Sequence, residues 1–307
     1  MPAVPEVSGL DAESRRIYEG QLKARIGRFW KEYRGYKRGL AGLFMVGGLA
    51  LVAIFAPIIA PYDPNQLVVA RPFTPPNGNN WLGTNDLGQD IFSQLVYSAR
   101  ISLSIAILIA LTTIIIATIV GIIAGYYGGK VDQVLMSFTD IFLVLPGIPL
   151  IIIVAAYLGP GFWNIVFVIS ILSWPGAARI IRAQTLSIKE RSFVEATQAL
   201  GGSHAFVMIN CILPNVLPLI FANAVLRVVD AILLEAMVSF LGLGDPTRES
   251  WGTMLYYAQQ GMAFGVGAWW WVISPGLCIS IAAFGCSLIG TTLDGIFNPR
   301  LTTRTWG

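Results

Sequence analysis

The chain has 307 residues, of which 55% are hydrophobic and 12% are charged, and its mean hydropathy is +0.68. A soluble domain carries about 25% charged residues, so this composition leaves too little polar side chain to cover a water-facing surface. The formal net charge of +3 indicates no nucleic-acid partner, and three cysteines without a C-x-x-C pair indicate neither a disulfide framework nor a zinc site.

The N-terminal region, residues 1–38, is polar and charged. It is too long and too polar for the leading part of a signal peptide, so we expect the apolar segment that follows to be retained. Over residues 13–37 the basic side chains are interspersed with aromatic and aliphatic ones, which is typical of an amphipathic helix lying at a membrane interface. An arm that binds a partner is the alternative interpretation.

Six apolar segments follow, and each can cross a bilayer as a helix, because about 20 residues rising 1.5 Å apiece span a hydrocarbon core. Backbone polar groups in lipid must be satisfied internally, which favours helices over irregular structure. The sequence therefore predicts an all-α membrane protein with a permease domain at 39–295, a short tail at 296–307, and spans at roughly 39–60, 99–126, 133–158, 162–179, 215–242 and 269–293.

Positive charge is distributed unevenly about these spans. Most of the 20 Lys and Arg residues fall on the side that holds both chain ends, and the opposite side receives Arg71, Arg100 and Arg248. Cytoplasmic loops carry the excess of Lys and Arg. We therefore expect both termini in the cytoplasm of a multi-pass plasma or inner membrane protein.

Three connecting regions are long enough to form structure of their own. On the predicted outer side, residues 61–97 are rich in Pro, Asn and Gly and are expected to form an ordered cap, and residues 243–268 form a second loop. Trp269, Trp270 and Trp271 follow this loop, where indole rings prefer the headgroup level of the membrane. On the inner side, residues 180–214 connect the fourth and fifth spans.

The inner loop contains signals for a short helix outside the membrane. Ser192 and Glu195 fit the S-x-x-E capping box, and Gly201 is placed to end the helix after about two turns. Ser203 can cap a second helix that leads to Leu213 and Pro214. Judged on spacing alone, an ordinary connecting helix is the favoured interpretation of this pattern.

The same loop resembles the EAA loop of ABC importer permeases. In that pattern, E-A-A is followed after three residues by Gly, and then after about nine residues by an apolar residue, Leu and Pro. This chain has Glu195-Ala196-Thr197-Gln198-Ala199-Leu200-Gly201 followed by Ile212-Leu213-Pro214, and it departs at Thr197, where a second Ala is usual.

Four more stretches are similar to the dipeptide/oligopeptide/nickel branch of these permeases, and the long outer loop is similar to that of the second, or C-type, permease. Gln89 departs from the usual Arg in the first stretch, and Asn298 from the usual Asp in the last. The stretches are Leu82-Gly83-Thr84-Asn85-Asp86-Leu87-Gly88-Gln89-Asp90, Gly125-Tyr126-Tyr127-Gly128-Gly129-Lys130-Val131-Asp132, Ser239-Phe240-Leu241-Gly242-Leu243-Gly244 and Asn298-Pro299-Arg300-Leu301.

The resemblance implies a type I ABC importer permease fold in which the short inner helix, the coupling helix, sits in a cleft of an ATPase subunit. The implied partners are a second homologous permease, two ATPase subunits that bind ATP and Mg, an extracytoplasmic substrate-binding protein and membrane lipid. The implied contact core is Glu195, Ala196 and Gly201, with Arg191, Ser203 and His204 at its rim.

The chain lacks a nucleotide site of its own, because no G-x-x-x-x-G-K-[ST] stretch is present. We therefore expect no cofactor and no catalytic or metal site in this chain, with energy supplied by another subunit. An ion-coupled secondary transporter is the first rival class, although it commonly shows an inverted repeat, which we do not find here. An intramembrane enzyme is the second rival, and it would need a nucleophile with a base or a metal cluster.

Four ionisable residues fall away from the ends of the predicted spans. Each costs roughly 2.5–3.5 kcal/mol at mid-membrane on insertion scales, so each should face protein or a watery cavity. They either line a translocation path or form structural pairs between helices: Asp140, Arg227, Asp230 and Glu235. A mixed-charge lining suits di- or oligopeptides, with oligosaccharides or nickel as alternatives within the same type of importer.

Overall fold

The computed structural model describes residue 27 and residues 30–297. Most of the predicted interfacial helix at 13–37 and most of the tail at 296–307 therefore lie outside the described residues. Within the described part the chain is helical, with a single isolated bridge between Thr84 and Asp90 in place of any sheet. The prediction of an all-α membrane protein is confirmed.

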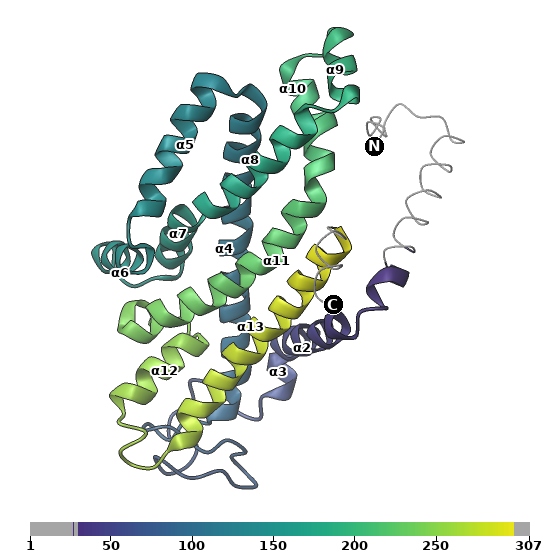
Figure 1. Ribbon diagram of the computed structural model, residues 1–307. Coiled ribbons are helices and arrows are strands. Elements are labelled where there is room, and N and C mark those ends of the chain that lie inside the picture. The colour runs from purple at the N-terminus through teal and green to yellow at the C-terminus, as the bar shows by residue number, and fades with distance from the viewer. Residues whose placement is uncertain (1–26, 28–29, 298–307) are drawn as a thin grey trace, which may run out of the picture.

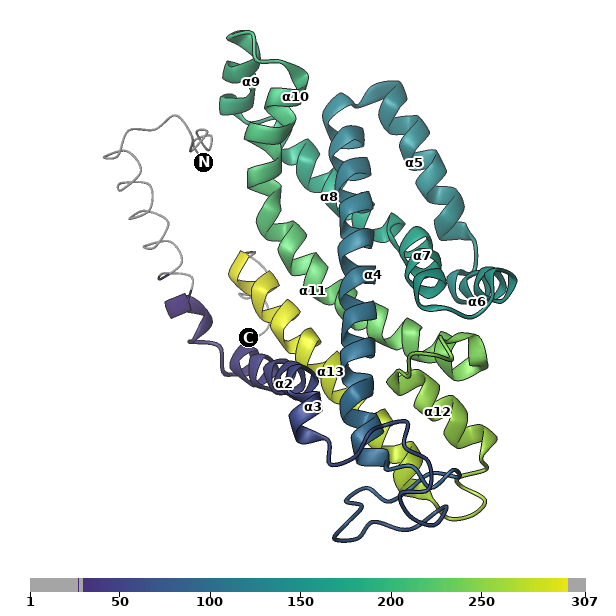
Figure 2. The same cartoon turned by 180° about the vertical axis from the view of Figure 1, so that it is seen from behind.

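Helix α4 (Ile91–Tyr127) runs through the length of the bundle, as Figures 1 and 2 show from opposite sides. Its 37 residues correspond to about 55 Å at 1.5 Å per residue, well beyond the roughly 30 Å hydrocarbon core of a membrane. It begins earlier than the predicted boundary at residue 99, because Asp90 caps it by accepting a hydrogen bond from the backbone of Ser93 at 2.8 Å. The excess length carries the attached elements beyond the apolar zone.

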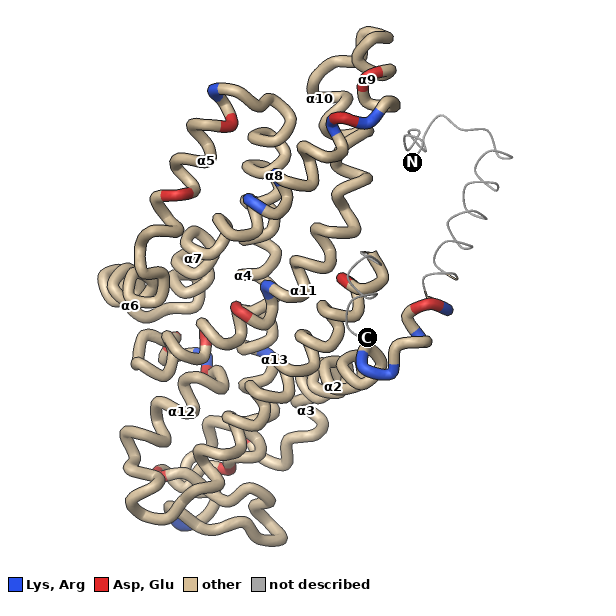
Figure 3. Tube along the Cα trace, in the orientation of Figure 1, with Lys and Arg blue, Asp and Glu red and all other residues tan. Residues whose placement is uncertain are grey.

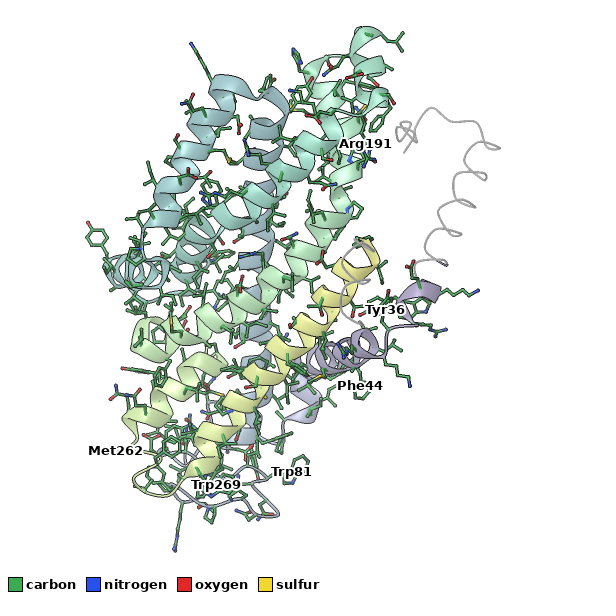
Figure 4. The ribbon with its side chains drawn as sticks, in the orientation of Figure 1. Tyr36, Phe44, Trp81, Arg191, Met262 and Trp269 are labelled. Carbon is green, nitrogen blue, oxygen red and sulfur yellow. The ribbon has the colours of Figure 1, made fainter. Side chains whose placement is uncertain are left out.

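The bundle has two ends, which are named here by the short helices they carry. The α9 end holds α9 (Ser192–Ala199) and α10 (His204–Phe206), and the α12 end holds α12 (Trp251–Gln260) and the long loop of residues 60–90 (Figure 1). Exposed Trp81, Met262 and Trp269 mark the α12 end, and Arg191 lies near the other (Figure 4). The remaining long helices are α2 (Lys37–Ile54), α11 (Leu213–Val238) and α13 (Trp269–Phe297).

The third and fourth predicted spans are each broken into two helices. Helices α5 (Gly129–Val144) and α6 (Gly147–Leu158) meet at 86°, and α7 (Phe162–Ser173) and α8 (Pro175–Lys189) meet at 45°. Proline explains both breaks, because Pro146 and Pro175 disfavour helical continuation through the residue before them. The described chain thus has four long apolar helices, and six spans if each bent pair crosses as one.

Helix α8 packs closely against the second half of α4. A Cβ atom added at Gly121 would lie 2.7 Å from the backbone oxygen of Ala178, and one added at Gly125 would lie 2.7 Å from the Cβ of Thr185. Small residues four apart allow two membrane helices to approach at backbone distance. On the other side of α4 an apolar stripe is half exposed, consistent with contact with lipid or another subunit: Ile107, Leu111, Ile115 and Ile119.

Two apolar clusters form the core. One lies toward the α12 end and includes Ile105, Trp251 and Trp271, and the other lies toward the α9 end and includes Ile181 and Val194. Three further elements connect to this frame: the short helix α3 (Ala56–Ile59) and the π-helical turns η2 (Val207–Ile212) and η3 (Ser239–Leu243) that flank α11.

The prediction that three consecutive tryptophans anchor the membrane boundary is wrong for two of them. Trp269 is exposed, whereas Trp270 and Trp271 are buried. Successive residues of a helix point in directions about 100° apart, so one helical turn cannot present three neighbours to the same surface. Trp271 instead belongs to the core cluster, and Trp270 donates a long hydrogen bond of 3.4 Å to the carbonyl oxygen of Thr84.

Candidate functional site

Helix α9 begins differently from the sequence prediction. Ser192 is its first helical residue, the N-cap position falls on Arg191, and no side chain caps the start, so the predicted capping box between Ser192 and Glu195 is not formed. Glu190 ends α8, which leaves Arg191 as the one extended residue between the two helices. The Arg191 carbonyl then accepts hydrogen bonds from the backbone of Val194 and Glu195.

The end of α9 has the predicted glycine stop. Gly201 has a φ of +83° and donates to the carbonyl of Gln198, while Gly202 donates to the carbonyl of Thr197, which together make a Schellman motif. Gly202 is also sterically restricted, since an added Cβ would lie 2.8 Å from the carbonyl oxygen of Thr197. The predicted cap at Ser203 is confirmed, because its hydroxyl accepts a hydrogen bond from the backbone of Phe206 at 3.2 Å.

One side chain fixes α9 to the bundle. Val194 is completely buried in the apolar cluster at the α9 end, and Phe193 packs partly against the same cluster. The opposite face is open, and at its tip Leu200 is 89% exposed. The remaining exposed residues of this face include the predicted contact core: Glu195, Ala196 and Gly201. A rigid, mostly polar surface with an apolar tip is suited to contact with another protein.

A hydrogen-bonded hub connects α9 and α10 to α4. The hydroxyl of Tyr126, near the end of α4, lies 2.8 Å from Nδ1 of His204 and accepts a hydrogen bond from Nε2 of Gln198 at 3.3 Å. The ammonium group of Lys189 lies 5.8 Å from the centre of the same ring, within the range of a cation–π contact. His204 is thus tied to the bundle although its side chain lies at an exposed position.

Two ion pairs connect α5 to α8. Arg182 binds Asp132 through two nitrogen atoms, and Arg179 binds Asp140. A guanidinium group that meets a carboxylate with two parallel hydrogen bonds fixes orientation as well as distance. Asp140, predicted as a path residue, is therefore the partner of a neighbouring helix, and its side chain remains half exposed.

The charged residues of α11 divide into two settings. Arg227 and Asp230 form the predicted i, i+3 pair at 2.8 Å, and Nε of Arg227 is buried without a hydrogen-bond partner in the described chain. Glu235 is buried and accepts a hydrogen bond from the hydroxyl of Ser239 at 2.8 Å. Among residues 30–297, no hydrogen bond or ion pair joins Asp140 to these three.

The hub residue Tyr126 was missed as a functional residue in the sequence. It lies within Gly125-Tyr126-Tyr127, one of the stretches that carry the family resemblance, but nothing in the spacing distinguishes it from Tyr127. Only its contacts in the folded chain, with Gln198 and His204, distinguish Tyr126 from its neighbour.

A bundle of long apolar helices with a short, anchored and exposed helix at one end is the arrangement of a multi-pass membrane protein. The chain belongs to the family described as "Binding-protein-dependent transport system inner membrane component", which matches residues 117–303. The family described as "N-terminal TM domain of oligopeptide transport permease C" matches residues 25–76.

Individual relatives match over most of both chains. A di/tripeptide transport system permease protein of Pseudomonas aeruginosa is 34% identical over 292 residues, covering 93% of this chain and 94% of the relative. An oligopeptide transport system permease protein of Bacillus subtilis is 34% identical, covering 89% and 90%. A dipeptide transport system permease protein of the same organism is 32% identical, covering 89% and 85%.

Proposed function

We propose that this chain is a pore subunit of an ATP-driven, binding-protein-dependent importer for di- or oligopeptides. The observation that carries the proposal is helix α9, which is stiffened by a Schellman stop, anchored by Val194 and tied to α4 through Tyr126. The substrate class follows from the relatives, whose names assign them to dipeptide, di/tripeptide and oligopeptide transport.

In this proposal the α9 end faces the cytoplasm. Lys130, Lys189 and Arg191 belong to that end, and Figure 3 shows basic residues at the start of α5, on α8 and beside α9. The positive-inside tendency of membrane proteins supports this orientation. The α12 end, with the long loop, then faces the substrate-binding protein outside.

The exposed face of α9 is the proposed docking surface for an ATPase subunit that binds ATP and Mg. Glu195, Ala196 and Gly201 form the contact core, and the rim consists of Arg191, Ser203 and His204. Closure of two ATPase subunits would move α9, and a second homologous permease would complete the pore. The short stiff helix transmits this motion because it cannot bend between its anchor and its exposed tip.

The translocation path is proposed to pass the charged part of α11. Arg227 offers a buried donor without a partner and Asp230 is half exposed, so this pair can meet both charged ends of a zwitterionic peptide. Glu235 contributes to the path indirectly, by accepting a hydrogen bond from the hydroxyl of Ser239. Asp140 lies farther along the proposed path and is paired with Arg179.

A substitution in α9 tests the coupling role. Glu195→Ala is expected to reduce ATP-dependent peptide uptake at least about tenfold, since charge-assisted contacts at protein interfaces contribute about 1.5–3 kcal/mol. Membrane insertion should be unchanged, because Glu195 is exposed and its side chain makes no hydrogen bond or ion pair within the described chain. Uptake into proteoliposomes and co-purification of the ATPase measure the two effects.

The matched control for ATPase attachment is Asp63→Asn, which changes an exposed carboxylate at the opposite end. Normal uptake and normal ATPase attachment in Glu195→Ala would contradict the coupling role. Uptake that persists when the ATPase nucleotide site is disabled, and that runs on an ion gradient instead, would contradict the importer itself.

A further inference from the structure

A cavity of about 390 Å³ opens at the α12 end, between the long loop and helix α12. The long loop and the start of α4 contribute Asn85, Asp86 and Gln89, and the segment around α12 contributes Glu249, Tyr257 and Gln260. This cavity lies apart from α9 and from the Arg227–Asp230 pair. Its volume falls within the range of roughly 300–1,000 Å³ that is usual for ligand pockets.

The wall near the long loop is held in place by amide hydrogen bonds. Oε1 of Gln89 accepts from Nδ2 of Asn85 at 2.7 Å and from Nε2 of Gln94 at 3.0 Å. The next turn is fixed by Asp90, which accepts from Nδ2 of Asn80 at 3.0 Å and caps α4. The cavity is therefore preformed and does not depend on a ligand for its shape.

The charge of the lining is one-sided. Asp86 and Glu249 bring two carboxyl groups, and no Lys or Arg residue is among the lining residues. The nearest cation in sequence, Arg248, turns away and lies over the ring of Phe162 at 5.2 Å. Tyr257 adds an aromatic ring, which attracts cations through its face.

Glu249 is the distinctive group of this cavity. Its carboxyl makes no hydrogen bond or ion pair within the described chain, and burial raises its pKa to about 7. The pKa of Tyr257 is also raised, by burial and by the charge of Glu249, which places the two side chains close together. A partly buried carboxyl without a counter-ion is an incomplete arrangement that a cation would complete.

The size of the cavity argues for an organic cation over a bare metal ion. A space of 390 Å³ exceeds the volume of roughly ten water molecules at about 30 Å³ each, whereas a metal site closes tightly around its ion. In addition, no group of three or more His, Cys, Asp or Glu side chains suited to a metal ion occurs among the described residues.

We propose that this cavity binds an organic ammonium or guanidinium group, with Glu249 as its counter-ion and Tyr257 as an aromatic wall. Two sources can supply this chemistry, the terminal ammonium of an arriving peptide or a basic side chain of a protein docked at the α12 end. The identity of the source, although not the binding itself, rests on the proposed function as an importer subunit.

The binding is tested on the full-length chain in lipid nanodiscs, by calorimetric titration with n-butylammonium chloride against sodium chloride of equal ionic strength. We expect Glu249→Gln to weaken binding about tenfold, because hydrogen bonds to charged groups contribute about 1.5–3 kcal/mol. Glu249→Asp should retain part of the affinity. Arg248→Gln, the matched control beside it, should lose none. Equal binding by wild type and Glu249→Gln would overturn the proposal.

The affinity should also depend on pH in a defined direction. The pKa of Glu249 is raised to about 7, so its carboxyl is mostly neutral at pH 6 and mostly charged at pH 8. A cation prefers the carboxylate, so butylammonium affinity should rise across this window in the wild type and stay flat in Glu249→Gln. Asp86 and Tyr257 face the same cavity from the long loop and from α12. Asp245 and Arg248 lie close to Glu249 in sequence.

Asp245 does not account for such a rise. Burial alone would raise its pKa, but hydrogen bonds from Thr247 and from the backbone of Phe162, together with the charge of Arg248, lower it below the ordinary value. Asp245 is therefore charged throughout the pH window. A rise of equal size in Glu249→Gln would overturn the assignment of Glu249 as the counter-ion.

The source is resolved in the complete importer, reconstituted with its ATPase and binding protein. If the peptide supplies the cation, Glu249→Gln raises the half-saturating concentration of dialanine more than that of N-acetyl-dialanine, and binding-protein stimulation is unchanged. If the docked protein supplies it, Glu249→Gln raises the binding-protein concentration needed to stimulate ATP hydrolysis. No change in either quantity would overturn a role for the cavity in transport, and loss of all uptake in the wild type would instead count against the proposed function.

Discussion

The Gly121→Ala substitution is expected to lower the free energy of unfolding by about 1–3 kcal/mol, the usual cost of overpacking a close contact. The added Cβ would meet the backbone oxygen of Ala178 at 2.7 Å and the side chain of Ile181 at 2.9 Å. A backbone oxygen cannot rotate away as the end of a side chain can, so α4 and α8 must separate. Unfolding by SDS titration in mixed micelles, followed by tryptophan fluorescence, measures the change.

Gly47→Ala in α2 is the matched control, because an added Cβ there has nothing within 4 Å. In an open helical position the same chemical change favours the helix by roughly 0.5–1 kcal/mol. The two variants should therefore shift stability in opposite directions. Equal shifts in the same direction would contradict the close contact between α4 and α8.

The Tyr126→Phe substitution is expected to reduce substrate-stimulated ATP hydrolysis by the complete importer about tenfold. It removes the hydroxyl that connects α4 to His204 and Gln198 but keeps the ring, and two hydrogen bonds of about 0.5–1.5 kcal/mol each are lost. Because the buried ring still fills its place, folding and insertion should be close to normal. ATPase assays with and without peptide measure the loss.

Tyr127→Phe provides the comparison at the neighbouring position. Its side chain is 47% exposed, and its hydroxyl makes no hydrogen bond within the described chain. It should behave as the wild type. If both tyrosine variants lowered stimulation equally, or neither did, the hub at Tyr126 would have no special part in coupling.

Local sequence signals were enough to predict the α9 region in outline. Gly201 lies where only a residue tolerant of positive φ ends a helix easily, and Ser203 provides a side-chain cap to the next turn. The capping box failed because Ser192 itself entered the helix, a shift of one residue that depends on where α8 ends. Helix starts are set by tertiary context as much as by the capping residue.

The broken spans illustrate a different limit. Pro146 and Pro175 were visible in the sequence, yet proline in a membrane helix gives either a mild kink or a sharp bend. Neighbouring helices decide between these outcomes. The angles of 86° and 45° therefore could not be read from residues 133–179 alone.

The contacts that define the site connect residues far apart in the chain. Tyr126 and His204 are separated by 78 positions, and no periodic pattern relates them. The contact between α4 and α8 did have a signal, because Gly121 and Gly125 fit the G-x-x-x-G pattern of closely packed membrane helices. The Glu249 cavity had none, since its lining is gathered from two regions far apart in the sequence, the long loop with the start of α4 and the segment around α12.

Helix α4 is a proline-free rod that begins at Asp90, beside the cavity, and ends beside Tyr126. Helices α11 and α13 each contain an internal proline, and the α5–α6 and α7–α8 pairs are bent, so these elements can absorb a displacement along their length. If a rod about 55 Å long rotates by about 5° about one of its ends, the other end moves sideways by about 5 Å. A small rotation of α4 at Tyr126 would therefore shift its opposite end by several bond lengths, at the opening through which the substrate would enter.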